Sequence, residues 1–445
     1  MSGLAEILIS LGYKVSGSDV KTSNKTLKLE KMGAKIIPYH SEENIDNQDL
    51  VVYTAAINHN NPELQKARKL NIPTIDRATL LGMIMKKYNY RITVSGTHGK
   101  TTTTSMISTI MMESGLDPTV HIGAELESIG GTTRLGSNNY MVAEACEYQG
   151  SFLKFHPNMA VILNIEYDHA DYFKNIEHVK EYFLKFSNRI PQDGYIVACV
   201  DDPNVSWLLD KLSCNKITFG IKSENALWSA TNIKFDSDGT TTYTLLKNKK
   251  EITGIKLQVT GMHNVSNSLG AIAACNALGC SIASIKSALL KFTGVHQRFE
   301  LKGVINNIRV FDDYAHHPSE IKATLKSAKN CNPSKIWCVF QPHTYSRAKY
   351  LLDEFATSFS DADVVIISDI YAARELDTGE IHSSMLVKKI NSYGEKAIYI
   401  SDFTEIAKYL HENASPGDIV VTMGAGNISK VGEIFLQSEG IKAVS

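Results

Sequence analysis

The sequence predicts an α/β fold with three domains. Short apolar segments of strand length alternate with helical segments along most of the chain. A glycine-rich turn at residues 96–102 lies between one such strand and a helix, and consecutive strands without helices occupy residues 226–259. We therefore expect a Rossmann-like domain at 1–88, a P-loop-type domain with a small antiparallel sheet at 89–298, and a second Rossmann-like domain at 299–445.

Composition narrows the class of partner. The 445 residues are 43% hydrophobic and 21% charged, and the formal net charge is −1. No basic block stands out, which argues against nucleic acid or an anionic membrane as the main partner. No apolar run is long enough for a membrane span, and the first residues lack the basic region of a signal peptide. The seven cysteines form no Cys-x-x-Cys pair, which argues against structural zinc and predicts a reduced, cytoplasmic protein with mostly buried cysteines.

The first domain should begin with a helix that ends near Gly12, followed by a strand from Lys14 to Asp19. An acidic residue at the end of a second strand is the usual ribose contact of a nucleotide-binding βαβ unit, so Asp19 is a candidate substrate ligand. The first strand and its glycine-rich loop do not precede this helix, however. Either the start of the chain is truncated or misplaced, or Asp19 is only a loop carboxylate.

The rest of this domain continues the alternation. Further strands are expected at 35–37, 50–54 and 72–75. Pro62 should open a helix at its first turn, where its missing N–H costs nothing, and another helix should start at Arg77.

The central domain opens with a phosphate-binding turn. Ile92 and Val94 predict a strand, and a helix should follow from Thr101. Backbone N–H groups at such a turn and helix N-terminus attract an anion, Lys100 adds a positive charge, and the Thr101 hydroxyl can bind Mg²⁺. Val94 occupies the place of the first glycine in the Walker pattern, so a strand–helix turn with a surface lysine is the plain alternative. The predicted cofactor-binding residues here are Gly96, Thr97, Gly99, Lys100, Thr101 and Thr102.

Two further strands of the central domain end in polar residues. Glu144 ends the strand that starts at Tyr140, and His169 follows the strand that starts at Met159. Ligands of open parallel sheets bind at the carboxyl ends of the strands, so Glu144 and His169 should share an edge with Lys100. Taken singly, each could instead be an ordinary solvated side chain.

The next segment is expected to contain consecutive strands with no helix between them. Strands are expected at 228–235, 240–246 and 255–259, with Asp238-Gly239 as a hairpin turn. Two helices should follow, one starting near Gly261-Met-His-Asn-Val-Ser-Asn267 and one at 282–292.

The third domain again places polar residues after strands. Strands are expected at 308–312, 335–341, 364–368, 398–401 and 419–422. The residues that follow the first two include a cluster that indicates a binding edge, namely Asp313, Tyr314, His316, His317, His343, Tyr345 and Arg347.

The ordered set of these motifs resembles the Mur ligases, ATP-dependent enzymes that build the peptide of bacterial peptidoglycan. It comprises Gly96-Thr-His-Gly-Lys-Thr-Thr102, Glu144, Asn164…Asp168-His169, Gly261-Met-His-Asn-Val-Ser-Asn267, Arg298 and Asp312-Asp-Tyr-Ala-His-His-Pro318. His98 and Gln341-Pro-His-Thr-Tyr-Ser-Arg347 are most similar to the members that join L-alanine to the carboxylate of UDP-N-acetylmuramate. In the family, a glycine-rich loop for the UDP diphosphate lies just before the position of Met1, so the resemblance implies an N-terminally truncated chain.

The resemblance also implies roles for residues. Lys100 would neutralise the γ-phosphate of ATP, and His98 would lie beside the reacting groups and the substrate. Thr101 and Glu144 would hold one Mg²⁺, and His169 would help to hold a second. Asn264 and Asn267 would sit near the nucleotide base, Arg298 on the phosphates and Asp313 near the ribose. For the amino acid, Arg347 would anchor the carboxylate, with His343, Tyr314 and His316 as orienting groups.

Several alternatives remain open at this stage. A P-loop kinase would need only the central domain, and a non-catalytic nucleotide-binding relative would fit the absent first loop. Within the family, a ligase that recycles murein tripeptide would use the same residues with a larger substrate. A monomer or weak homodimer without membrane insertion is expected.

Overall fold

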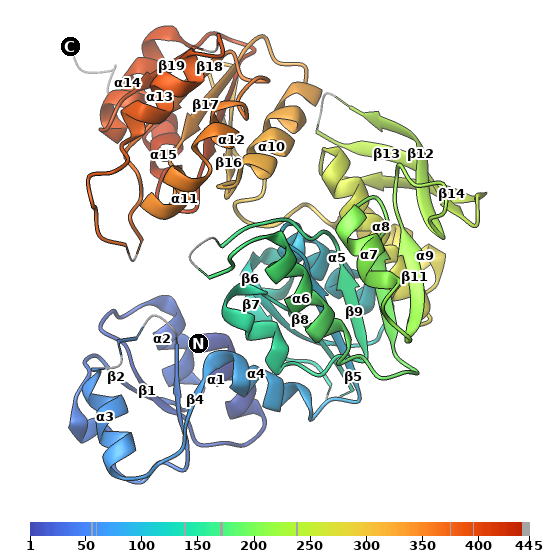
Figure 1. Ribbon diagram of the computed structural model, residues 1–445, viewed down its shortest axis with the longest axis vertical. Coiled ribbons are helices and arrows are strands. Elements are labelled where there is room, and N and C mark those ends of the chain that lie inside the picture. Colours follow the sequence, from blue (N-terminus) through green and yellow to red (C-terminus); the bar gives the residue numbers. More distant parts are fainter. Residues whose placement is uncertain are drawn as a thin grey trace. The chain divides into compact units, whose positions relative to one another are not determined.

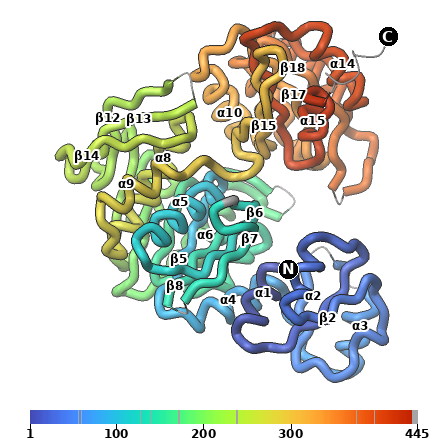
Figure 2. Tube along the Cα trace, turned by 180° about the vertical axis from the view of Figure 1, so that it is seen from behind, coloured from blue at the N-terminus to red at the C-terminus, as the bar shows by residue number. Residues whose placement is uncertain are grey.

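The computed structural model describes residues 1–54, 57, 58, 60–137, 139–169, 172–236, 239–373, 375–394 and 396–437. The chain forms two compact units. The first contains residues 1–165, 179–217 and 274–280, and the second contains residues 166–178, 218–273 and 281–445. Figures 1 and 2 show the elements of each unit from opposite sides.

The first unit starts with four short strands and four helices. The strands pair in parallel as β1 with β2 and β3 with β4. Asn61 caps the helix that Pro62 opens, since its side chain accepts hydrogen bonds from the N–H groups of Glu63 and Leu64 at 2.9 and 3.3 Å. These elements are α1 (Ser2–Ser10), β1 (Ser16–Ser18), α2 (Asn24–Lys31), β2 (Lys35–Ile37), β3 (Val51–Tyr53), α3 (Pro62–Lys69), β4 (Thr74–Asp76) and α4 (Arg77–Met85).

A larger sheet forms the rest of the first unit, with the strand order β11-β10-β9-β5-β8-β6-β7. The helix α5 packs on β5, β6 and β8, and its residues from Thr101 to Ser108 are all buried. Its bounds and those of its neighbours are β5 (Tyr90–Ser95), α5 (Lys100–Glu113), β6 (Thr119–Leu126), β7 (Gly131–Arg134), β8 (Tyr140–Glu144), β9 (Met159–Ile162), α6 (Ile176–Ser187), β10 (Tyr195–Cys199), α7 (Pro203–Leu209) and β11 (Asn215–Phe219).

The second unit begins with an antiparallel meander. The strands β12 (Trp228–Phe235), β13 (Thr241–Lys247) and β14 (Lys250–Leu257) pair in sequence order. The helices α8 (Met262–Ala277) and α9 (Ile282–Lys291) follow. The expected antiparallel strands are therefore confirmed, although β14 starts five residues earlier than the expected Ile255. They do not form a separate sheet, because β12 also pairs in parallel with β11, Trp228 opposite Phe219. Of the expected Asp238-Gly239 turn, Asp238 lies outside the described residues.

A six-stranded sheet forms the remainder of the second unit, in the order β15-β16-β20-β17-β18-β19. Alternate residues of its strands enter two different cores, because successive side chains of a strand point to opposite faces. Phe340 and Val421 pack with α10, α12 and α13, whereas Val339 and Val420 pack with α14 and α15. The elements are β15 (Glu300–Ile305), β16 (Ile308–Asp313), α10 (Pro318–Asn330), β17 (Ile336–Phe340), α11 (Tyr345–Tyr350), α12 (Leu352–Ala356), β18 (Val364–Ile367), α13 (Ser383–Asn391), β19 (Ala397–Tyr399), α14 (Phe403–Asn413), β20 (Ile419–Met423) and α15 (Ser429–Gln437).

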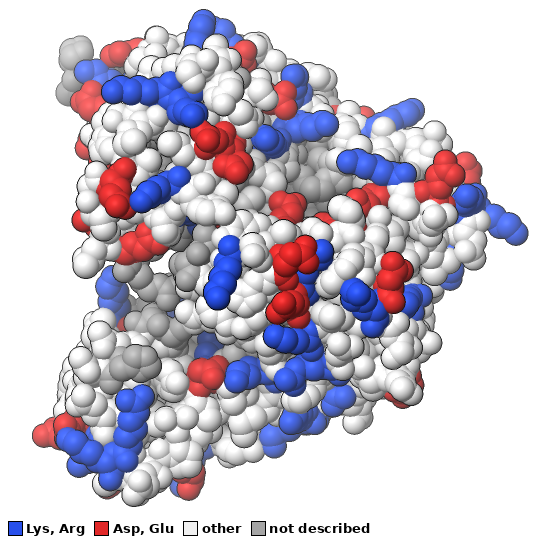
Figure 3. All heavy atoms as spheres, in the orientation of Figure 1, with Lys and Arg blue, Asp and Glu red and all other residues white. Residues whose placement is uncertain are grey.

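The surface view agrees with the balanced composition. Lysine and arginine side chains are interspersed with aspartate and glutamate on the face drawn in Figure 3. No helix in the described part of the chain is both long and apolar enough to cross a bilayer. Six of the cysteines are buried as expected, but Cys146 is exposed.

Candidate functional site

The glycine-rich turn of the first unit is the loop from the end of β5 to the start of α5. Gly96 has φ 146° and Gly99 has φ 82°, a backbone region that favours glycine. A Cβ on Gly96 would come within 3.0 Å of the Leu163 Cβ and 3.2 Å of the Asn164 backbone. The loop therefore needs glycine at position 96 both for its conformation and for its close approach to the segment after β9.

Asn164, two residues after the end of β9, braces this loop. Its side-chain oxygen accepts a hydrogen bond from the His98 N–H at 2.8 Å, and its side-chain NH₂ donates to the His98 carbonyl at 3.1 Å. The Asn164 carbonyl also accepts from the Thr97 N–H at 3.3 Å. Because both backbone groups of His98 are held, the loop is preorganised. Asn164 belongs to the Asn164…Asp168-His169 motif, but nothing in the sequence indicates this contact with the loop.

Lys100 folds back over the loop. Its Nζ donates to the carbonyls of Gly96 at 2.5 Å and Thr97 at 3.0 Å, and it pairs with Glu147 Oε2 at 3.2 Å. Burial lowers the pKa of Lys100, but the neighbouring Glu147, Cys146 and Glu144 together outweigh burial and raise this pKa above its ordinary value. Lys100 thus carries a full positive charge at a glycine-rich turn. Glu147 is a partner that the sequence prediction did not include.

Thr101 and Thr102 open α5 and are both buried. No described side chain caps this helix by a hydrogen bond. The positive end of the helix and the ammonium of Lys100 therefore face the same turn, which is the arrangement of an anion site.

Glu144 lies at the same edge of the sheet. It is paired in register with Val94 of β5, two residues before Gly96, and it accepts a hydrogen bond from the Gly123 N–H at 2.7 Å. The expectation that Glu144 and the lysine-bearing turn share a strand edge is therefore confirmed. A threonine hydroxyl and a carboxylate are oxygen ligands of the kind that Mg²⁺ prefers.

The second unit holds the other predicted residues, and Arg347 is their centre. Its Nη2 donates to Asp168 Oδ1 at 3.1 Å, and its Nη1 lies 3.2 Å from the His343 Nδ1. The His343 ring stacks with Tyr371, with 5.8 Å between ring centroids, and lies 5.8 Å from the His316 ring. The structure thus brings His316, His343 and Arg347 together, as the sequence predicts, and adds Asp168 and Tyr371.

Charge and burial set the protonation states in this cluster. Burial would raise the pKa of Asp168, but His169 and the Arg347 guanidinium lower it well below its ordinary value. Burial lowers the pKa of His316 to about 4, although Glu320 acts in the opposite direction. At neutral pH, Asp168 is therefore a carboxylate and His316 a neutral imidazole.

The N-terminus of α10 fixes several neighbours. Glu320 accepts hydrogen bonds from the N–H groups of His316 at 3.0 Å and His317 at 3.2 Å, which forms a capping box. The Arg298 guanidinium lies 3.9 Å from Glu320 and 5.3 Å from the centroid of the Tyr314 ring. Arg298 and Tyr314 are therefore adjacent.

Asp313 is buried between two backbone donors. Its oxygens accept from the N–H groups of Phe299 and Ala315, each at 2.7 Å. Burial raises the pKa of Asp313 to about 6, although Arg298 lowers it.

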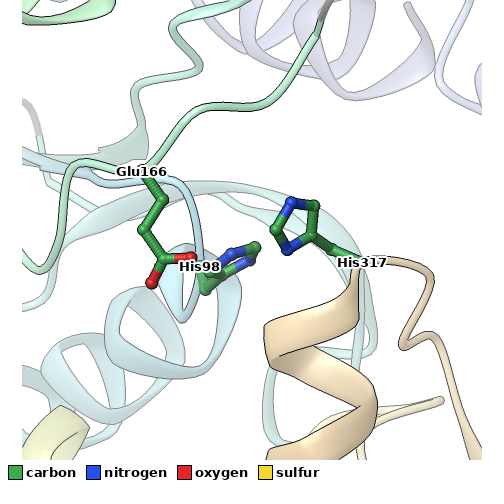
Figure 4. Close-up of side chains that lie close together, drawn as sticks. All are labelled: His98, Glu166 and His317. Carbon is green, nitrogen blue, oxygen red and sulfur yellow. The ribbon is translucent and has the colours of Figure 1, made fainter. Parts of the chain in front are cut away.

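A carboxylate and an imidazole lie close together near this helix start. Glu166, on the loop after β9, and His317 have ligand atoms within 4.8 Å of each other. Figure 4 shows these two side chains, and also His98 on the turn before α5. His169 has a left-handed backbone, with φ 57°, and its Nε2 lies 3.8 Å from Asp168 Oδ2. The sequence indicates no role for Glu166.

The remaining predicted residues lie further along the chain. Asn264 and Asn267 are buried in the first turns of α8, where the Asn264 side-chain NH₂ donates to the Thr260 carbonyl at 2.8 Å. Asp19 is exposed after β1, and it accepts a hydrogen bond from the Lys21 N–H at 3.0 Å. That bond forms a local turn.

Comparison with known families identifies the class of protein. The Mur ligase family catalytic domain matches residues 1–89, the Mur ligase middle domain matches 94–275, and the Mur ligase glutamate ligase domain matches 297–426. The chain belongs to the Mur ligase family, and it has the three-domain α/β fold that the sequence predicts.

Several individual proteins are similar to this chain over nearly its whole length. The chain is 63% identical to the UDP-N-acetylmuramate–L-alanine ligase of Acetivibrio thermocellus, over 100% of this chain and 95% of that protein. It is 51% identical to the ligase of the same name from Caldanaerobacter subterraneus, over 98% of this chain and 95% of the other. Among solved structures, the UDP-N-acetylmuramate–alanine ligase of Thermotoga maritima superposes with a TM-score of 0.82 at 29% identity and covers 99% of this chain and 97% of its own.

A murein peptide ligase is also similar. The structure of the murein peptide ligase from Psychrobacter arcticus superposes with a TM-score of 0.70 at 25% identity. It covers 100% of this chain, and 97% of that protein is matched.

Proposed function

We propose that this protein is an ATP-dependent ligase that joins L-alanine to the carboxylate of UDP-N-acetylmuramate through an acyl phosphate. The observation that carries the proposal is the charged Lys100 on a preorganised glycine-rich turn, in a chain 63% identical to a ligase of that name over its whole length. Such a reaction would serve peptidoglycan synthesis in the cytoplasm.

The chemistry explains why a phosphate site and an amino-acid site are both needed. A carboxylate is a poor electrophile, so one of its oxygens first attacks the γ-phosphorus of ATP and ADP leaves. The amine of L-alanine then attacks the carbonyl carbon of the acyl phosphate. The tetrahedral intermediate collapses, the C–O bond to phosphate breaks, and the amine nitrogen loses a proton. Inorganic phosphate departs with one oxygen of the original carboxylate.

Phosphoryl transfer requires positioning and neutralisation of charge more than covalent help. Lys100 would exchange its loop carbonyls for the γ-phosphate, which is a stronger acceptor for an ammonium group. The loop residues Gly96, Thr97, Gly99, Thr101 and Thr102 would bind the phosphates through their backbone N–H groups. His98, whose backbone is held by Asn164, would lie beside the reacting carboxylate.

The residues at the sheet edge fit a divalent cation. Thr101 and Glu144 would supply oxygen ligands for one Mg²⁺, and His169 would contribute to a second. Bound Mg²⁺ would neutralise the phosphate oxygens during transfer.

Other residues of the second unit would bind the nucleotide. Asn264 and Asn267 would contact the base, Arg298 the phosphates and Asp313 the ribose. In the first unit, Asp19 would contact the ribose of the UDP-sugar. For L-alanine, Arg347 would bind the carboxylate, and Tyr314, His316 and His343 would orient the molecule.

The test measures phosphate release from the full chain with ATP and Mg²⁺. Release should require UDP-N-acetylmuramate and should be completed by L-alanine, with the amide as product. ATP hydrolysis independent of both substrates would overturn the proposal. A stable phosphorylated product without an amide would favour a kinase instead.

A second candidate is a ligase that attaches a murein tripeptide, favoured by the superposition with the murein peptide ligase of Psychrobacter arcticus. Competition between L-alanine and tripeptide, with UDP-N-acetylmuramate and ATP held constant, discriminates between the two. Preference for L-alanine supports the first function, and preference for the tripeptide supports the second.

A further inference from the structure

The ion pair between Asp168 and Arg347 lies inside the second unit and uses a carboxylate that the chemistry above does not need. Asp168 Oδ1 and Arg347 Nη2 are 3.1 Å apart. The side chains are 9% and 12% exposed, so both charges are largely withdrawn from water. The two residues are 179 positions apart in sequence, so the pair is formed by the fold.

Burying an ion pair of this kind costs desolvation free energy, so its presence calls for a functional explanation. Removing two charges from water costs several kcal/mol for each ion, and the attraction between them does not reliably exceed that cost. Stability alone therefore gives no strong reason for a buried Asp–Arg pair. A ligand that carries one charge of each sign gives such a reason, because each member of the pair would meet an opposite charge.

The free α-amino acid is such a ligand. Its carboxylate is complementary to the planar guanidinium of Arg347. In this structure Nη1 of that guanidinium lies 3.2 Å from His343 Nδ1, and Nη2 donates to Asp168 Oδ1. Its ammonium is complementary to a carboxylate. We propose that Asp168 is a specificity-determining residue that binds the α-ammonium group of the incoming amino acid while Arg347 binds its carboxylate. This inference rests on the proposed function and adds the second half of the amino-acid site.

Both oxygens of Asp168 have nitrogen-bearing side chains beside them. His169 Nε2 lies 3.8 Å from Asp168 Oδ2, and Arg347 Nη2 lies 3.1 Å from Asp168 Oδ1. A carboxylate oxygen accepts hydrogen bonds, so Asp168 orients the ammonium group of the amino acid.

Ligands that carry only one of the two charged groups should respond differently to substitution of Asp168 and of Arg347. L-Alanine carries both, whereas propionate carries only the carboxylate. Asp168→Asn keeps the size of the side chain and an oxygen that can accept from Arg347, but it removes the negative charge. It should weaken binding of L-alanine without weakening binding of propionate. Arg347→Gln should weaken binding of both.

The experiment uses the full chain with ATP, Mg²⁺ and UDP-N-acetylmuramate. For Asp168→Asn, the KM for L-alanine should rise roughly 10- to 100-fold, the range for losing one charge-assisted hydrogen bond. The KM for ATP should stay within a few-fold of the parent value. The inhibition constant of propionate against L-alanine should be unchanged or lower, because Arg347 no longer has a competing carboxylate. A merely structural role for Asp168 would weaken both ligands equally.

Asp353→Asn is the matched control. Asp353 also forms an ion pair, with Lys389 at 2.7 Å, but its side chain is 73% exposed. The Asp353→Asn variant should leave the KM for L-alanine, the KM for ATP and the inhibition constant of propionate unchanged.

Three outcomes would overturn the inference: an unchanged KM for L-alanine in Asp168→Asn, a lower KM, or an equal loss of propionate binding. A lower KM would mean that Asp168 obstructs Arg347. Failure of the parent chain to use L-alanine at all would instead overturn the proposed function. The two results are distinguishable, because the parent chain is measured first.

Discussion

Two buried ion pairs, one in each unit, differ in the kind of cation and in how it is held. In the first unit, Lys100 pairs with Glu147 and also donates to two carbonyls of its own loop. In the second, Arg347 pairs with Asp168 and lies against the His343 imidazole. A lysine ammonium is a compact charge that can move from loop carbonyls to a phosphate. An arginine guanidinium is a planar fork that suits a carboxylate.

The two sites differ in how far they can be recognised from sequence. Two of the three groups that accept hydrogen bonds from the Lys100 ammonium lie within four residues of it, so the local motif indicates the site. The partner of Arg347 comes from a distant segment, so only the fold reveals it. If the two pairs have separate roles, substitutions at Lys100 and Glu147 should affect the phosphate site, and a substitution at His316 should affect the second unit.

The largest expected effect is that of Lys100→Ala. Turnover should fall by about 100-fold or more, the scale for losing one preorganised electrostatic stabiliser. Steady-state phosphate release measures it. Lys250→Ala, which removes an exposed lysine of β14, should leave turnover unchanged. Turnover of the Lys100 variant within a few-fold of the parent would contradict the assigned role.

Glu147→Gln should mainly affect stability. It leaves the Lys100 charge buried without its carboxylate partner, which should lower the free energy of unfolding by about 3 kcal/mol. Saturating ATP should reduce this loss, because the phosphates give the ammonium another anionic partner. Chemical denaturation with and without ATP measures both quantities. Glu412→Gln, at an exposed position of α14, is the control and should change neither. If Glu147→Gln lowers the free energy of unfolding equally with and without ATP, Glu147 does not act together with the phosphate site.

The smallest effect concerns pH and belongs to the second unit. Because the pKa of His316 is about 4 in the folded chain, the unfolded chain binds a proton that the folded chain does not as the pH falls from about 6.5 to 4. The free energy of unfolding should therefore decrease on acidification, by up to about 1.4 kcal/mol per pH unit for this group. His316→Gln should make that slope shallower, as measured by denaturation at a series of pH values. Equal slopes for the parent and the variant would show that His316 is not buried as a neutral imidazole.

Much of the fold could be predicted from sequence because its signals are local. Apolar strands such as Met159–Ile162 and capped helices such as the one after Asn61 carry their signals within a few residues. Three strands were not predicted, namely β6, β7 and β15. The strand β7, Gly-Thr-Thr-Arg, has no apolar residue, and in β15 an exposed Leu301 and the glycine at 303 obscure the alternation. Their pairing to neighbouring strands, rather than their own composition, makes them strands.

The candidate site shows the same division. Gly96, Lys100 and Glu144 could be placed at one edge because strand ends and glycine turns are visible in sequence. Glu147, Asn164 and Asp168 could not be assigned contacts, since each depends on which distant segment the fold brings to it. Whether the predicted residues have their proposed roles, and whether the domains divide at 88 and 298, remain predictions.

The most direct test of the central claim follows the oxygen atoms of the substrate carboxylate. UDP-N-acetylmuramate labelled with ¹⁸O in that carboxylate is incubated with the full chain, ATP, Mg²⁺ and L-alanine, and the released phosphate is analysed by mass spectrometry. An acyl-phosphate route predicts one ¹⁸O atom in each phosphate released and one retained in the amide. Phosphate without ¹⁸O, formed alongside the amide, would contradict the account.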